Sequence, residues 1–253
     1  MSAKLQIFLI FVAKKDAKMI DKESDEIIQE LTAIGSDEKS QALARFFKTG
    51  KGQYGEGDRF LGVAVPMVRQ VARKHLQASW QTLDRLLASP WHEARLCALL
   101  IMVLRWKHSS EEDRRQSFEF YLAHSHRINN WDLVDLSAPT IVGHYLLDKP
   151  RDVLYAMAGS ELLWDNRIAM VATLGLMRDG VLDDTYRLAT TLFSHKHDLI
   201  HKAVGWMLRE AGKRDEPRLI KFLHEHRLEM PRTTLRYAIE RLPQSLRQTL
   251  MSR

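Results

Sequence analysis

Residues 162–175 read LLWDNRIAMVATLG, and their apolar side chains recur at the spacing of an α-helix. Ile168, Val171, Ala172 and Gly175 stand three or four positions apart, so they share one helix face, which we expect to be buried. The same spacing recurs at residues 65–72, 96–103 and 203–208. No segment of the sequence alternates convincingly between apolar and polar residues, as a half-buried strand would. The sequence therefore predicts an all-α protein.

The helices are arranged at a regular interval along the chain. The basic or aromatic residue of successive apolar helices recurs at separations of 36, 36, 35 and 34 residues, at Arg95, Trp131, Arg167, Lys202 and Arg236. This period is typical of an α-solenoid of HEAT-like antiparallel helix pairs, in which each unit buries its apolar face on its neighbours. We expect one solenoid domain over residues 1–253, with residues 1–25 as an N-terminal extension or a first helix.

Composition excludes several classes of protein. With 45% hydrophobic and 28% charged residues, the chain is unlike collagen, disordered or disulfide-framework sequences. Cys97 is the single cysteine, which excludes an internal disulfide and a multi-cysteine zinc site and favours the cytoplasm. The longest apolar run, residues 5–13, is too short to cross a membrane. A signal peptide is the less favoured alternative, because lysines stand where a cleavage site would be.

The positive charge is concentrated near the C-terminus. The net charge is +6, and residues 201–253 carry all of the excess, while residues 45–74 form a second basic stretch. Clustered cations and a pI near 9.4 are typical of a protein that binds a polyanion such as nucleic acid. Equivalent positions of stacked repeats line one face, so the repeating basic and aromatic residues predict a basic concave surface for a phosphate backbone. The alternative explanation for the clustered basic residues is that they lie on solvated helix faces.

Residues 129–143, NNWDLVDLSAPTIVG, carry the most specific pattern. Trp131 and Asp135 are four positions apart and share a helix face. Asp132 lies in the first turn, where the helix dipole explains a carboxylate, but Asp135 lies deeper and has no such explanation. Asp135 is therefore a candidate functional carboxylate. The alternatives are an ion pair between Asp135 and an arginine of a neighbouring repeat, and simple core packing for Trp131.

Two further helices carry related residues. Arg167 has the planar guanidinium that binds phosphate, or it pairs with Asp135 or Asp132, and these roles can coexist. Lys202 and Trp206 share a helix face, and Gly205 beside them would let another surface approach closely. A tryptophan inside an apolar pattern is also explained by core packing.

Other catalytic motifs are missing from the sequence. The glycine-rich stretch at residues 50–62 does not fit a phosphate-binding loop, and the three His-x-His pairs place their rings on different helix faces. No G-x-S-x-G motif occurs, and Cys97 lies in the apolar run LCALLIMVL. We expect no metal and no cofactor.

Taken together, the segments WDLVDLSAPTIVG, LLWDNRIAMV, HKAVGWMLREAG and RTTLRYAIERL resemble the AlkD-type DNA alkylation repair glycosylases over residues 40–243. The resemblance implies a C-shaped stack of HEAT-like helix pairs, acting as a monomer on duplex DNA. It implies release of cationic N3- and N7-alkylated purines, which leaves an abasic site. Asp135 matches the catalytic aspartate, Trp131 and Trp206 match the flanking aromatics, and Arg167 matches the arginine near the lesion's backbone.

The resemblance also indicates where DNA would bind. The aromatic residue of the first repeat falls at Phe46, which lacks the usual tyrosine hydroxyl, and the glycine-rich stretch departs from shorter members. We expect DNA contacts from Phe46, Lys48, Lys51, Arg95, Lys202, Arg209, Arg232 and Arg236. Two alternatives remain open: a DNA-binding solenoid without catalysis, and a protein-binding scaffold with its cations scattered over the convex face.

Overall fold

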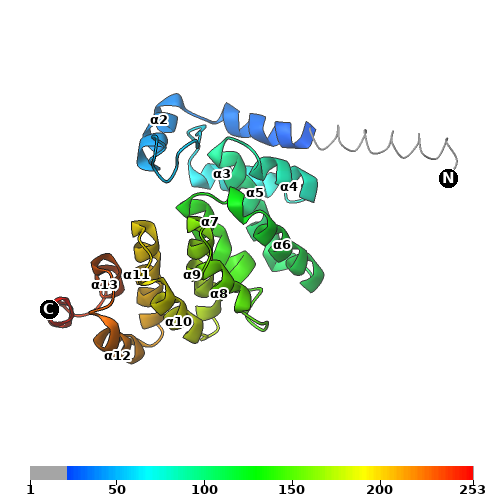
Figure 1. The fold of residues 1–253 in the computed structure, drawn as a ribbon. Helices are drawn as coiled ribbons and strands as arrows, with labels where there is room; N and C mark the ends of the chain where they lie inside the picture. Colours follow the sequence, from blue (N-terminus) through cyan, green and yellow to red (C-terminus); the bar gives the residue numbers. More distant parts are fainter. Residues whose placement is uncertain (1–21, 253) are drawn as a thin grey trace. The chain divides into compact units, whose positions relative to one another are not determined.

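The computed structural model describes residues 22–252, and the secondary structure of these residues is helical (Figure 1). Within this range, β-type pairing is limited to one isolated bridge between Arg59 and Trp91. The all-α fold predicted from the apolar spacing is confirmed. The chain divides into two compact units, with the boundary between His108 and Ser109. The single solenoid domain and its C-shape stay predictions. Of residues 1–25, expected to form an extension or a first helix, residues 22–25 are helical and residues 1–21 lie outside the described range.

The first unit contains a helix over residues 22–33 and five further elements. These elements are α2 (Asp37–Phe46), α3 (Val65–Lys74), α4 (Trp80–Leu87), α5 (His92–Arg105) and the short 3₁₀ helix η1 (Trp106–His108). Helix α5 is the centre of this unit, because it packs against both α3 and α4 and is buried along most of its length. Cys97 lies in this buried part of α5, as its apolar surroundings predicted.

The glycine-rich stretch at residues 50–62 forms a loop, as predicted, and α5 holds its end in place. The buried Glu93 carboxylate accepts hydrogen bonds from the backbone N–H groups of Leu61, Gly62 and Val63 at 2.8, 2.9 and 3.1 Å. Gly62 has a φ of +81°, which favours glycine at this turn. A buried acidic side chain of α5 therefore satisfies three backbone donors of an irregular segment.

Arg95 differs from the sequence prediction. The repeat spacing placed it on an exposed basic face, but the side chain is buried and donates to Asp58 Oδ1 at 2.6 Å and to the Ser89 carbonyl at 2.8 Å. The physical reason is that the glycine-rich loop brings Asp58 against α5, so the guanidinium finds its counter-charge inside the unit. Arg95 does not belong to an exposed basic row.

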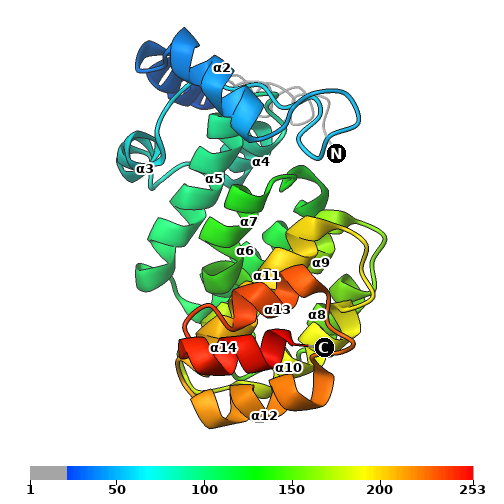
Figure 2. The ribbon, with the colours of Figure 1, turned by 90° about the vertical axis from the view of Figure 1, so that its left-hand side faces the viewer.

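The second unit contains the remaining helices (Figure 2). They are α6 (Glu111–Ala123), η2 (Ser125–Arg127), α7 (Trp131–Ala138), η3 (Pro139–Gly143), α8 (Asp152–Ala158), α9 (Leu163–Met177), α10 (Asp183–Leu192), α11 (Asp198–Gly212), α12 (Glu216–His226), α13 (Arg232–Ala238) and α14 (Gln244–Met251). Helices α9 and α11 are the two long, largely buried helices of the unit. Helix α9 packs against α7, η3, α8, α10 and α11, and α11 packs against α10, α12 and α13. Neighbouring helix pairs therefore share one core, as in a solenoid.

The segment after α7 contains a local irregularity. Pro139 follows α7 directly, and residues Pro139–Gly143 continue as a π-helical turn rather than ending the helix. Proline lacks the N–H that an α-helical hydrogen bond would need, so the wider turn accommodates it within a continuing helix.

No helix in residues 22–252 has the length and apolar character that a membrane crossing requires.

Candidate functional site

Helix α7 positions the two most specific residues of the sequence. Asn130 is the N-cap, and its side-chain oxygen accepts a hydrogen bond from the Trp131 N–H at 2.9 Å. The capped helix places Asp135 one turn beyond Trp131, and both side chains are half-buried. Asp132 lies in the first turn, as expected for a carboxylate near the helix N-terminus.

Helix α9 brings Arg167 to Asp135. The guanidinium donates from Nε to Oδ1 at 2.9 Å and from Nη2 to Oδ2 at 2.8 Å, so both carboxylate oxygens are bound. The side chains are 6% exposed for Arg167 and 17% exposed for Asp135. The sequence left Asp132 and Asp135 open as partners for Arg167, and the structure selects Asp135 for the ion pair.

A third contact ties the pair to helix α11. Arg167 Nη1 donates to the backbone carbonyl of Leu199 at 2.7 Å, in the first turn of α11. Three of the five N–H donors of the guanidinium are thus committed to fixed partners, which orients its plane. Nothing in the sequence around Leu199 indicates this contact, because a backbone carbonyl has no side-chain pattern.

The electrostatics of Asp135 result from two opposing effects. Burial raises the pKa of the Asp135 carboxyl above its ordinary value, and the nearby Asp132 charge adds to the rise. The positive charge and hydrogen bonds of Arg167 act in the other direction. The result is a carboxylate that is poorly solvated, partly exposed and held by one cation.

One buried side-chain contact links helix α6 to α7. The hydroxyl of Tyr121, which is fully buried, lies 2.9 Å from Ser137 Oγ, and Ser137 Oγ donates to the Leu133 carbonyl. Burial raises the pKa of Tyr121 well above its usual range, so the phenol stays protonated and keeps this bond. Buried hydrogen bonds from Tyr121 and Ser137 therefore help to fix the backbone of α7, the helix that carries Asp135.

Trp206 and Lys202 lie on α11, the helix that receives Arg167. Trp206 is half-buried, and Lys202 pairs with Asp198 at 2.8 Å. Gly205 makes a close approach, as predicted, because a Cβ at this position would lie 2.5 Å from the Thr234 carbonyl oxygen of α13. The convergence of Trp131, Trp206 and Asp135 on one point stays a prediction.

The other expected DNA contacts differ in exposure. In the first unit, Phe46 is 62% exposed at the end of α2, and Lys48 and Lys51 follow it. In the second unit, Arg209 is paired with Glu240, while Arg232 is exposed and donates to the Met251 carbonyl at 3.0 Å. The structure thus places several cations at accessible positions, and their role in DNA binding remains a prediction.

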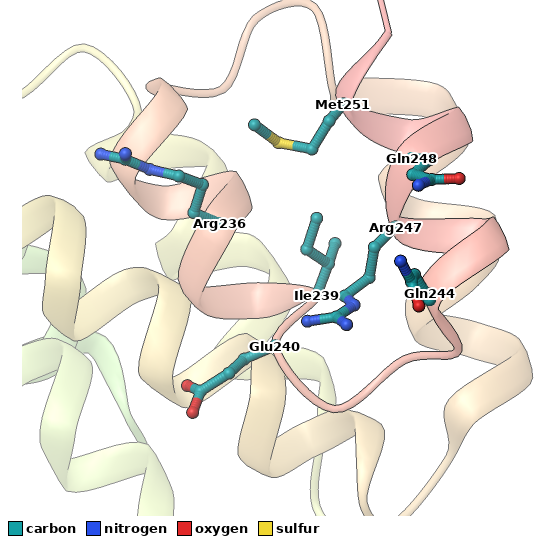
Figure 3. A pocket seen from close by; sticks show the side chains of 7 residues that line it. All are labelled: Arg236, Ile239, Glu240, Gln244, Arg247, Gln248 and Met251. Carbon is teal, nitrogen blue, oxygen red and sulfur yellow. The ribbon is translucent and has the colours of Figure 1, made fainter.

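Arg236 lines a pocket of about 420 Å³ between α13 and α14 (Figure 3). Arg247 reaches from α14 toward α13, whereas Arg236 points away from the pocket centre. Ile239 and Met251 contribute the apolar lining. The RTTLRYAIERL segment places Arg236 on α13, but nothing in the sequence of α14 indicates that the two helices enclose a pocket.

Histidines near the N-terminus of α11 bind backbone groups. His197 Nδ1 accepts from the Leu199 N–H at 3.1 Å, and the His201 ring contacts the His195 carbonyl. Within residues 22–252, no group of three His, Cys, Asp or Glu side chains is arranged to hold a metal ion.

A family model and a solved structure both relate this chain to DNA alkylation repair enzymes. A family model described as "DNA alkylation repair enzyme" matches residues 27–242. A solved structure of a predicted DNA alkylation repair enzyme from Enterococcus faecalis superposes with a TM-score of 0.64 at 17% identity, covering 83% of this chain and 97% of that chain. At this identity the likeness shows the fold alone. No curated protein sequence matches.

Proposed function

Because the chain belongs to the DNA alkylation repair enzyme family, we propose that it hydrolyses the N-glycosidic bond of N3- and N7-alkylated purines in duplex DNA. The bidentate ion pair between Asp135 and Arg167, with the carboxylate still partly exposed, is the observation that carries the proposal. Release of the base would leave an abasic site without strand cleavage.

The substrate's own charge explains why one carboxylate would suffice. Alkylation at N3 or N7 makes the purine cationic, so the base leaves with the bonding electrons as a neutral molecule and needs no general acid. The deoxyribose then develops positive charge, which a poorly solvated carboxylate stabilises. Asp135 has this environment, and its exposed fraction is where the sugar or the attacking water would meet it.

Arg167 would have two roles in this mechanism. Its Nε and Nη2 donors orient the Asp135 carboxylate, and its Nη1 bond to Leu199 fixes the guanidinium plane. The remaining N–H groups would contact the phosphate beside the lesion. Preorganisation of this kind removes the cost of orienting charges during the reaction.

Trp131 and Trp206 would bind the cationic sugar and base through their ring faces. Each such cation–π contact contributes about 0.5 to 2 kcal/mol. Phe46, Lys48, Lys51, Lys202, Arg209, Arg232 and Arg236 would contact the DNA backbone. These contacts would position the duplex rather than read its sequence.

The ion pair also gives specific support to the alternative function. Because Arg167 donates to both oxygens of Asp135, each oxygen already has a partner, as in a purely structural pair. The chain would then be a DNA-binding solenoid without catalysis. The two functions predict different effects of removing the Asp135 carboxylate on base release.

Single-turnover release of 7-methylguanine from a defined duplex separates them. For a glycosylase, Asp135→Asn abolishes release while duplex binding persists. Asp184→Asn is a matched control, because Asp184 is a largely buried carboxylate paired with Arg151 at 3.1 Å in the same unit. Absence of release by the wild-type protein, despite tight binding, would favour the alternative for this lesion.

A further inference from the structure

Two glycines form the crossing between α9 and the helical segment of α7 and η3. A Cβ built at Gly143 would lie 2.1 Å from the Ala172 carbonyl oxygen, and one at Gly175 would lie 2.1 Å from the Pro139 carbonyl oxygen. Both distances are far inside van der Waals contact. The two backbones therefore touch, and only glycine allows this approach.

The glycine crossing lies the same number of residues from the ion pair on both helices. Asp135 stands eight residues before Gly143, and Arg167 stands eight residues before Gly175. At a rise of about 1.5 Å per residue, the crossing lies about 12 Å along each helix from the pair. The two segments therefore run in parallel and meet at two points, the glycine crossing and the Asp135–Arg167 fork.

This register links the backbone approach to the geometry of the site. The fork closes at 2.8 and 2.9 Å, and hydrogen bonds weaken steeply once the atoms separate by a further half ångström or so. An added methyl group at either glycine would clash with a backbone carbonyl oxygen of the other helix. Such an atom cannot rotate away as the end of a flexible side chain can, so the two backbones must separate. The helices that carry Asp135 and Arg167 would move apart.

We propose that Gly143 and Gly175 are positioning residues that hold the Asp135 carboxylate and the Arg167 guanidinium at bonding distance. The inference rests on the proposed function in that it assigns these glycines to the same site. A purely structural role for the crossing would lower stability without changing the environment of Asp135.

The titration of Asp135 is the readout that separates these roles. Besides Arg167 on α9, Asp132 on its own helix and the buried Tyr121 hydroxyl on α6 interact electrostatically with this carboxyl. Arg167 alone among these favours the ionised form. A looser fork therefore raises the titration midpoint of Asp135, whereas a loss of packing elsewhere leaves it unchanged.

The experiment compares wild type with Gly175→Ala and Gly143→Ala by ¹³C-carboxyl NMR titration, with the signal assigned through Asp135→Asn. We expect a higher midpoint in both variants, and single-turnover release of 7-methylguanine that is roughly 10- to 100-fold slower at neutral pH. Duplex binding should stay within about twofold of wild type. Gly143 ends η3 and is followed by turns, so its variant is the milder of the two.

Two glycines of the same unit supply the controls. At Gly159 a Cβ would lie 3.6 Å from the nearest atom, so Gly159→Ala should change neither the titration midpoint of Asp135 nor the rate of base release. At Gly212 it would lie 2.3 Å from the Leu219 side chain, so Gly212→Ala disturbs packing away from the pair and should lower Tm alone. The proposal is overturned if Gly143→Ala and Gly175→Ala behave like Gly212→Ala. If the wild type releases no base, the proposed function fails, and the titration still decides whether the glycines position the pair.

Discussion

Arg95 donates a hydrogen bond to Asp58 at 2.6 Å inside the first unit, and the two side chains are only 6% and 2% exposed. Arg167 occupies the corresponding position two repeat periods later and also binds an aspartate, but Asp135 is 17% exposed. Both units thus contain a buried arginine paired with an aspartate, but the carboxylate is buried in the first unit and partly exposed in the second. This difference in exposure is why we propose a chemical role for the Asp135–Arg167 pair and not for the Arg95–Asp58 pair.

The sealed pair gives a prediction about stability. Asp58→Asn should lower the free energy of unfolding by about 3–5 kcal/mol, because it leaves the buried Arg95 guanidinium without its counter-charge. Asp148→Asn is the control, since that carboxylate is 80% exposed. Urea unfolding followed by circular dichroism measures both variants. Equal, small effects would show that Arg95 is solvated rather than sealed.

The sequence predicted the helices well because their determinants are local. Apolar residues at three- and four-residue spacing indicate which segments are helical, and these segments are helices in the structure. The interpretation of Asp135 as the candidate carboxylate also rests on a local argument, because the helix dipole explains a carboxylate at Asp132 and not at Asp135, and its role in catalysis stays a prediction.

The sequence could not predict contacts that depend on irregular backbone. Arg95 is buried because a glycine-rich loop brings back Asp58, and no periodicity describes that path. The π-helical turn at Pro139 and the Leu199 carbonyl that binds Arg167 are equally invisible to spacing arguments. Tertiary contacts made through the backbone therefore set the limits of the sequence prediction.

Replacement of Arg167 tests the fork itself. Arg167→Lys keeps the positive charge but loses the two parallel N–H bonds, so base release should fall by about 10²-fold while duplex binding changes little. Arg151→Lys, in the pair with Asp184, is the matched control and should release base at the wild-type rate. Single-turnover kinetics and binding anisotropy give both values. An unchanged rate in Arg167→Lys would mean that charge alone is sufficient.

The pH dependence of base release follows from the raised pKa of Asp135. The reaction needs the carboxylate, so activity is present above this pKa and is lost as the pH falls through it. The acid limb should therefore lie at a higher pH than the ordinary value of 3.8 for an aspartic acid. Single-turnover rates over a pH series test this, with lesion-free duplex binding measured at each pH. An acid limb at or below the ordinary value would contradict the assignment.

The single cysteine provides a test of the first unit's core. Burial raises the pKa of Cys97 to about 12, so the thiol is neither ionised nor accessible near neutral pH. The native protein should react with a thiol reagent such as Ellman's reagent far more slowly than the urea-unfolded chain. A native rate that matches the unfolded rate would show that α5 opens readily in solution.

Trp206 tests whether an aromatic face acts on a cationic substrate. Trp206→Leu keeps an apolar side chain on α11 but removes the ring, so release of 7-methylguanine should slow by about 2- to 30-fold, the equivalent of roughly 0.5–2 kcal/mol. Trp206→Phe should fall between wild type and the leucine variant, because phenylalanine has the weaker cation–π interaction. Thermal unfolding separates this effect from a loss of packing. Equal rates in the phenylalanine and leucine variants would indicate that Trp206 acts by filling space, since the ring would then contribute nothing beyond its volume.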